Sequence, residues 1–145
     1  MSCIVLTTDL SDESKRAFPP VVELAETLDL PITLLAVLED LPFEPTGGGI
    51  VAVYPDRGQM HRDWDEKLQV MKAQLRTRVE VRAELVDAVD IPRAICEFAE
   101  QQQARYVAMA THGRSGLRRL LLGSVVEAVL RHSHVPVIAY PPPRS

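Results

Sequence analysis

Short apolar runs along the chain alternate with longer segments in which apolar residues recur at helical spacing. Four runs are apolar on both faces, as in the buried strands of a parallel sheet: residues 3–8, 32–38, 105–110 and 135–140. Residues 79–85 instead alternate apolar and charged side chains, which predicts a strand with one wet face at a sheet edge. The helical segments lie between the strands, at residues 11–28, 60–75, 91–99 and 124–130.

This alternation predicts a single-domain α/β fold over residues 1–145, with no internal repeat or linker. Strands joined by helices form parallel sheets with right-handed crossovers and helices on both faces. We therefore expect an open five-stranded parallel sheet with strand order 3-2-1-4-5.

Capping residues and prolines mark where the helices begin. Ser11 is a candidate N-cap with acidic residues in the following turn. The pair Pro19 and Pro20 predicts either a kink in this helix or a helix that starts at the prolines. Asp90 is expected to cap the third helix. Ser124, with a glutamate three residues later, matches a capping box and predicts the N-cap of the last helix.

Residues 39–59 contain the densest cluster of prolines and glycines in the chain and predict a flexible loop. A loop of about 20 residues in a compact domain tends to be functional or mobile. The following helix carries one apolar stripe, which we interpret as core rather than as a cofactor-binding surface: Met60, Trp64, Leu68, Met71 and Leu75.

The composition, 46% hydrophobic and 25% charged, is that of an ordinary soluble globular protein. The apolar runs are far shorter than the roughly 20 residues that span a bilayer, and the N-terminus lacks the features of a secretory signal. We therefore expect a cytoplasmic protein. Cys3 and Cys96 lie among apolar residues and are expected to be buried and unreactive, without a disulfide or metal cluster.

Charge is unevenly distributed along the chain. The formal net charge is −4, yet residues 1–100 carry 10 basic and 19 acidic side chains, whereas residues 101–145 carry 6 and 1. An acidic chain argues against general nucleic-acid binding. A basic last third is nevertheless compatible with a small phosphate-bearing ligand.

Residues 110–124 form the strongest candidate for a ligand site. Open parallel sheets bind ligands at the carboxyl ends of their strands, and this segment follows the fourth strand, beside Asp9 at the end of the first. It holds three of the seven glycines, and the helix that begins near Ser124 offers unpaired N–H groups to an anion. Three arginines add local positive charge: Arg114, Arg118 and Arg119.

Five short motifs are spread over nearly the whole chain: Thr8-Asp9-Leu10-Ser11, Leu35-Ala36-Val37, Thr111-His112-Gly113-Arg114-Ser115-Gly116, Leu122-Gly123-Ser124-Val125 and Pro136-Val137-Ile138. Together they resemble the universal stress protein family, in its ATP-binding subclass. The nucleotide motif of that family, G-x2-G-x9-G-[ST], is matched from Gly113 through Gly123 and Ser124. Ala110 stands in place of the first glycine.

The resemblance implies a Rossmann-like fold, of the adenine nucleotide alpha hydrolase-like kind, with an ATP site. Thr8 and Asp9 would lie by the ribose and adenine, and Val37 would meet the adenine edge. Met109 and Ala110 would line the ribose side. Residues around the motif glycines would bind the phosphates: Gly113, Gly123, Ser124 and Val125. Arg114 is also expected in the nucleotide site, where it supplies positive charge.

The resemblance also implies a homodimer formed through the last strand, residues 135–140, whose apolar edge would otherwise face water. Mg²⁺ would accompany the triphosphate. No catalytic residue or protein metal ligand is assigned, so any ATP hydrolysis should be slow. We expect a nucleotide-dependent regulatory switch in a stress response, without a nucleic-acid or membrane partner.

Other interpretations stay open at this stage. A methyl group at Ala110 costs about 1 kcal/mol if the backbone there has positive φ, and little otherwise. If nucleotide binding has been lost, the chain would be a dimeric protein-interaction module; a further alternative is a carrier or enzyme for another phosphorylated cofactor, such as a flavin. Several of the candidate site residues also have a purely structural alternative. Asp9 would cap the first helix, and Val37 would belong only to the core. His112 would be only a turn residue, and the three arginines would be only solvated surface residues.

Overall fold

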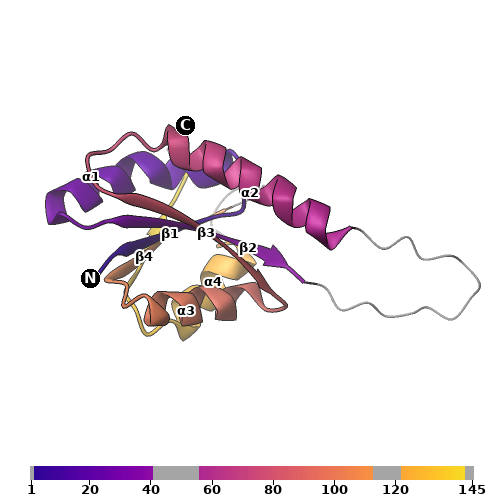
Figure 1. The fold of residues 1–145 in the computed structure, drawn as a ribbon. Helices are drawn as coiled ribbons and strands as arrows, with labels where there is room; N and C mark the ends of the chain where they lie inside the picture. The colour runs from indigo at the N-terminus through magenta and orange to yellow at the C-terminus, as the bar shows by residue number, and fades with distance from the viewer. Residues whose placement is uncertain (1, 41–55, 113–121, 143–145) are drawn as a thin grey trace, which may run out of the picture.

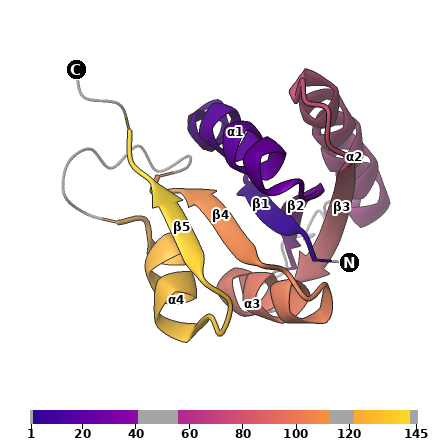
Figure 2. The same ribbon diagram turned by 90° about the vertical axis from the view of Figure 1, so that its left-hand side faces the viewer.

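The computed structural model of the protein describes residues 2–40, 56–112 and 122–142. Five parallel strands form one sheet in the order β3-β2-β1-β4-β5, which confirms the predicted order. The strands are β1 (Ile4–Thr8), β2 (Ile32–Glu39), β3 (Val81–Ala88), β4 (Tyr106–Ala110) and β5 (Val137–Tyr140). The alternating strand β3 lies at one edge of the sheet, as expected, and β5 lies at the other (Figure 2).

Helices cover both faces of the sheet. They are α1 (Phe18–Leu28), α2 (Arg57–Gln74), α3 (Ile91–Gln101) and α4 (Ser124–His132), with a short 3-10 helix η1 (Glu13–Ala17) before α1. Helices α1 and α2 lie on one face, and α3 and α4 lie on the other (Figure 1). Among the described residues, no helix is both long and apolar enough to cross a membrane.

The two-residue period of the strands divides the core between these faces. Ile4 and Leu6 of β1 pack in the cluster beneath α1 and α2. Val5, between them, packs in the cluster beneath α3 and α4. The second cluster also holds Cys3 and Cys96, both buried and unpaired, as predicted. Burial raises the pKa of the Cys96 thiol, which favours its unreactive protonated form.

The first α-helix starts at the prolines, the second of the two predicted alternatives. Pro19 and Pro20 lie in the first turn of α1, where a missing N–H removes no helical hydrogen bond. Residues before them form η1 instead. Ser11 precedes the η1 cap, Asp12, and its Oγ accepts the backbone N–H of Ser14 at 3.2 Å.

The other two predicted caps had different outcomes. Asp90 caps α3 as expected, since its Oδ1 accepts the N–H of Arg93 at 3.2 Å. The prediction for Ser124 was wrong, because Gly123, which has no side chain to form a cap, occupies the N-cap of α4. Glu127, expected to complete the capping box, instead pairs with Arg131 one turn later at 2.9 Å.

The predicted bounds of the loop 39–59 were wrong at both ends, because regular structure extends into them. Glu39 still belongs to β2, and α2 begins at Arg57, where the carboxylate of Asp56 caps it by accepting the N–H of Gln59 at 3.1 Å. Residues 41–55 lie outside the described residues. The first turns of α2 project past the carboxyl end of β2 (Figure 1).

Two neighbouring positions of α2 provide a test of this packing. Leu68 is fully buried against the sheet, whereas Val70 is 59% exposed. Leu68→Ala should lower the free energy of unfolding by about 2–5 kcal/mol, because a buried cavity forms. Val70→Ala, the matched control, should change it by less than about 0.5 kcal/mol. Urea denaturation followed by circular dichroism measures both, and equal effects would contradict the described burial of α2.

Candidate functional site

A cavity of about 530 Å³ opens at the carboxyl ends of the three central strands β2, β1 and β4. Helices α2, α3 and α4, the short helix η1 and the segments that follow β1 and β4 contribute the rest of its described wall. This is the position that an open parallel sheet predicts for a ligand.

The structure brings most of the predicted site residues together around this cavity. The predicted residues that line it are Thr8, Asp9, Val37, Met109, Ala110, Gly123, Ser124 and Val125. The two remaining predictions, Gly113 and Arg114, lie outside the described residues. The same is true of Arg118 and Arg119.

The α4 end of the cavity is built by a close backbone contact at Gly123. The N–H of Gly123 donates to the carbonyl of Thr111 at 2.8 Å, which joins the end of β4 to the start of α4. A Cβ atom at Gly123 would lie only 3.0 Å from that same oxygen. The φ of Gly123 is −57°, which any residue adopts, so this position favours glycine because of space.

Close packing at Gly123 directs the start of α4 into the cavity. The first N–H groups of an α-helix have no partner within the helix, and they carry the positive end of its dipole. Ser124 and Val125 contribute the first two of these groups, and both residues line the cavity. This end of the cavity therefore has the chemistry of an anion site.

Ala110 lies at the last position of β4, in register with Tyr140 of β5. The described non-glycine residues with positive φ are Leu10, Asp29 and Gln103, and Ala110 is not among them. The backbone at Ala110 therefore imposes no requirement for glycine.

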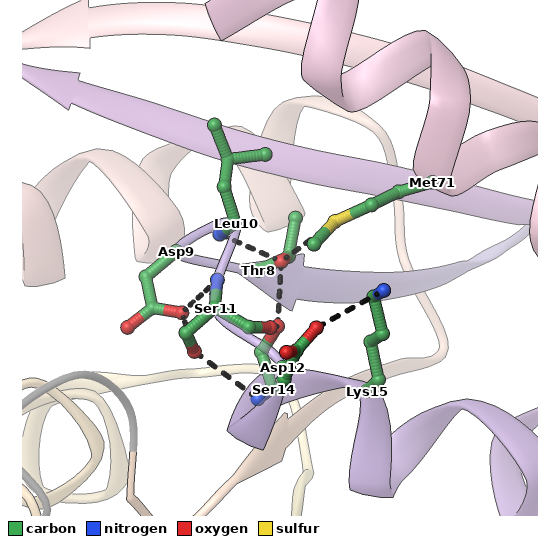
Figure 3. Close-up of polar contacts among 8 residues, drawn as sticks. All are labelled: Thr8, Asp9, Leu10, Ser11, Asp12, Ser14, Lys15 and Met71. Carbon is green, nitrogen blue, oxygen red and sulfur yellow. Dashed lines mark hydrogen bonds and ion pairs between the residues drawn. The ribbon is translucent and has the colours of Figure 1, made fainter.

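Two successive turns shape the chain after β1, where Asp9 enters the cavity wall (Figure 3). The Oγ1 of Thr8 accepts the N–H of Leu10 at 3.0 Å, and the Oδ1 of Asp9 accepts the N–H of Ser11 at 3.0 Å. The hydroxyl of Ser11 also donates to this oxygen. These bonds hold Leu10 at a φ of 67°, a conformation that costs a leucine roughly 1–2 kcal/mol. Asp9 thus both supports the entry to η1 and lines the cavity.

A chain of buried hydroxyl groups continues behind this turn (Figure 3). The Ser14 hydroxyl donates to the Ser11 carbonyl at 2.7 Å, so its oxygen accepts the proton of Thr8, also at 2.7 Å. The Thr8 hydroxyl additionally lies 3.5 Å from the Sδ of Met71 on α2. The network connects the floor of the cavity to η1 through Ser14 and to α2 through Met71.

The opposite part of the cavity is apolar. Val37 is 7% exposed and belongs both to the core and to the wall, so its two interpretations are compatible. The α2 stripe is divided: Leu68, Met71 and Leu75 are buried in the core, but Met60 and Trp64 line the cavity. Interpreting the whole stripe as core therefore missed two wall residues. The overhang of α2 beyond the sheet explains the division, and helical periodicity alone carries no sign of it.

His112 follows β4 and is buried in the cavity wall, with its Nδ1 3.0 Å from the hydroxyl of Thr111. Asp9 and Glu39 are the acidic residues among the described lining, which includes no lysine or arginine. Within the described parts of the chain, no cluster of three or more histidine, cysteine or acidic side chains has the arrangement of a metal site.

Solved structures with the same architecture include nucleotide complexes. The universal stress protein from Archaeoglobus fulgidus in complex with dAMP matches with a TM-score of 0.71 at 22% identity, over 96% of this chain and 97% of that one. A universal stress protein family member from Arabidopsis thaliana with AMP bound matches with a TM-score of 0.64 at 18% identity, over 99% and 93%. At these identities the comparisons establish the common fold.

Sequence comparison identifies the family directly. Universal stress protein MJ0531 of Methanocaldococcus jannaschii is 32% identical over 146 residues, which cover 97% of this chain and 82% of that protein. The model of the universal stress protein family matches residues 1–141. The chain therefore belongs to the universal stress protein family.

Proposed function

We propose that the cavity binds an adenine nucleotide, ATP together with Mg²⁺, and that the protein acts as a nucleotide-dependent regulatory switch in a stress response. The observation that carries this proposal is the close contact at Gly123, which directs the start of α4 toward the cavity. The opposite end of the cavity is apolar. A nucleotide needs both environments at once. The AMP and dAMP complexes of the two relatives support the choice of adenine.

In this proposal the backbone N–H groups of Ser124 and Val125 bind phosphate. The N–H of Gly123 is engaged with Thr111, so Gly123 contributes space rather than a hydrogen bond. Gly113 and Arg114 are proposed to complete the phosphate end. Asp9 accepts hydrogen bonds from ribose hydroxyls, since an ionised carboxylate is purely an acceptor.

The other predicted contacts lie nearer the centre and the apolar end. Thr8 is proposed to lie beside the ribose, with Met109 and Ala110 on its other side. Val37 is proposed to offer backbone groups to the adenine edge. All four residues belong to the carboxyl ends of the central strands.

Mg²⁺ would be held chiefly by the phosphates, because this ion usually keeps several waters and takes few protein ligands. If one carboxylate of the described wall also contacted the ion, it would be Asp9, which follows β1 beside β4. Rapid phosphoryl transfer requires a positioned general base and a cationic group at the γ-phosphate, and we assign neither role to a residue of the described wall. We therefore propose slow hydrolysis at most.

The alternative is a homologue that has lost nucleotide binding and serves as a dimeric interaction module. The reason to consider it is Ala110, which replaces the first glycine of the nucleotide motif and lines the cavity. The ordinary strand backbone at Ala110 supports the nucleotide-binding proposal instead.

We further propose a homodimer formed through β5. This strand is an edge of the sheet, and its four residues are only half-buried. An edge strand presents unpaired N–H and C=O groups that readily pair with another chain. Burial already raises the pKa of Tyr140 at the end of this strand.

Isothermal titration calorimetry with ATP and Mg²⁺ tests the nucleotide site, and Gly123→Ala provides its sharpest variant. Wild-type protein should bind ATP saturably. The added methyl group forces the start of α4 away from Thr111, which weakens hydrogen bonds to phosphate of about 1.5–3 kcal/mol each. The affinity should therefore fall about tenfold or more.

Gly58→Ala is the matched control, because the described atoms that a Cβ atom there would meet are side-chain atoms of Asp56 and Arg62. It should leave ATP affinity unchanged. Absence of saturable ATP binding to the wild type would refute the proposal, and equal effects of the two alanine substitutions would refute the role given to Gly123.

Ala110→Gly separates the two candidate functions. Because Ala110 has ordinary strand geometry, we expect ATP affinity to change by less than about threefold, with a stability loss of roughly 0.5–1 kcal/mol from the strand glycine. Calorimetry on both proteins measures this. Binding that appears only in the glycine variant would instead support the interaction-module alternative.

Light scattering coupled to size-exclusion chromatography tests the dimer. We expect twice the chain mass of 16.1 kDa at micromolar protein concentration. A monomer under these conditions would contradict pairing through β5.

A further inference from the structure

We infer that Trp64, on the second turn of α2, forms the surface against which the nucleotide base packs, and that it thereby determines base selectivity. This inference rests on the proposed nucleotide site and names a residue outside all the motifs of the sequence. Trp64 is half-buried and lines the cavity together with Met60, one turn earlier on the same helix.

Trp64 lies on the side of the cavity away from the expected phosphate end. Phosphate is expected at the start of α4, which is joined to the end of β4. Helix α2 contacts β2 and β3 on the other side of β1. Neighbouring strands lie about 4.8 Å apart, so roughly 10 Å separates the ends of β4 and β2. A nucleotide with phosphate at α4 therefore extends its base toward α2.

Polarity favours the same orientation. The start of α4 carries the positive end of a helix dipole, which suits phosphate. On the α2 side, Met60 and Trp64 present apolar groups to the cavity. Burying a charged phosphate against such groups is costly, so the neutral base is the suitable group for this side.

The chemistry of the wall matches a flat aromatic base. Trp64 also packs against the core cluster beneath α1 and α2, which holds the indole in place. Stacking of a base on an aromatic side chain contributes about 1–3 kcal/mol, and a purine offers a larger face than a pyrimidine. Removing the aromatic group should therefore reduce the affinity for ATP about tenfold or more. It should also reduce the ratio of the affinity for ATP to the affinity for CTP.

Trp64→Leu and Trp64→Phe form the test pair, with Val70→Ala on the exposed side of α2 as the control. Calorimetry should show a large loss of ATP affinity for the leucine variant and a change below about threefold for the phenylalanine variant. Ribose 5-phosphate, which has no base, should compete equally well against a fluorescent ATP analogue in all four proteins. This competition distinguishes a base contact from general damage to the cavity.

Wild-type fluorescence provides a readout that needs no variant, because Trp64 is the single tryptophan of the chain. ATP should change its emission saturably, with the dissociation constant found by calorimetry, and ribose 5-phosphate should leave the emission nearly unchanged. If ATP binds but neither the emission nor the Trp64→Leu affinity changes, the inference fails while the proposed function stands. If Trp64→Leu weakened the binding of ATP and of ribose 5-phosphate equally, the inference would also be overturned. If the wild type binds no nucleotide at all, both fail.

Discussion

The close contact between Gly123 and the carbonyl of Thr111 is the constraint on which the proposed site depends. It joins the end of a central strand to the start of α4 through a 2.8 Å hydrogen bond, and the space available favours glycine. Without this approach the first N–H groups of α4, which have no partner within the helix, would lie farther from the strand ends. The sheet then supplies the rest of the cavity, because its parallel strands bring the turn after β1 and the end of β2 to the same edge.

Much of this arrangement could be predicted from the sequence. Apolar runs on both faces identified β1, β2, β4 and β5, and the alternation in residues 79–85 identified the edge strand β3. The rule that ligands bind at the carboxyl ends of parallel strands then grouped residues that are distant in sequence, such as Asp9, Val37 and Gly123. The structure brings these three to one cavity.

Other features depend on three-dimensional packing that no local pattern records. Ser124 matched a capping box, yet the tight approach to Thr111 gives the N-cap to Gly123 and leaves Ser124 inside the helix. The apolar stripe of α2 predicts that all its residues belong to the core. The helix extends past β2, however, so Trp64 lines the cavity while Leu68 is buried. The cost of a methyl group at Ala110 likewise depended on a backbone angle that composition cannot supply.

A crystal structure of the protein soaked with ATP and Mg²⁺ tests the central claim most directly, since it locates both ends of the ligand. We expect phosphate density at the backbone N–H groups of Ser124 and Val125 and density for the adenine against Trp64. Phosphates located at the α2 end, or a cavity that stays empty at saturating ATP, would contradict it.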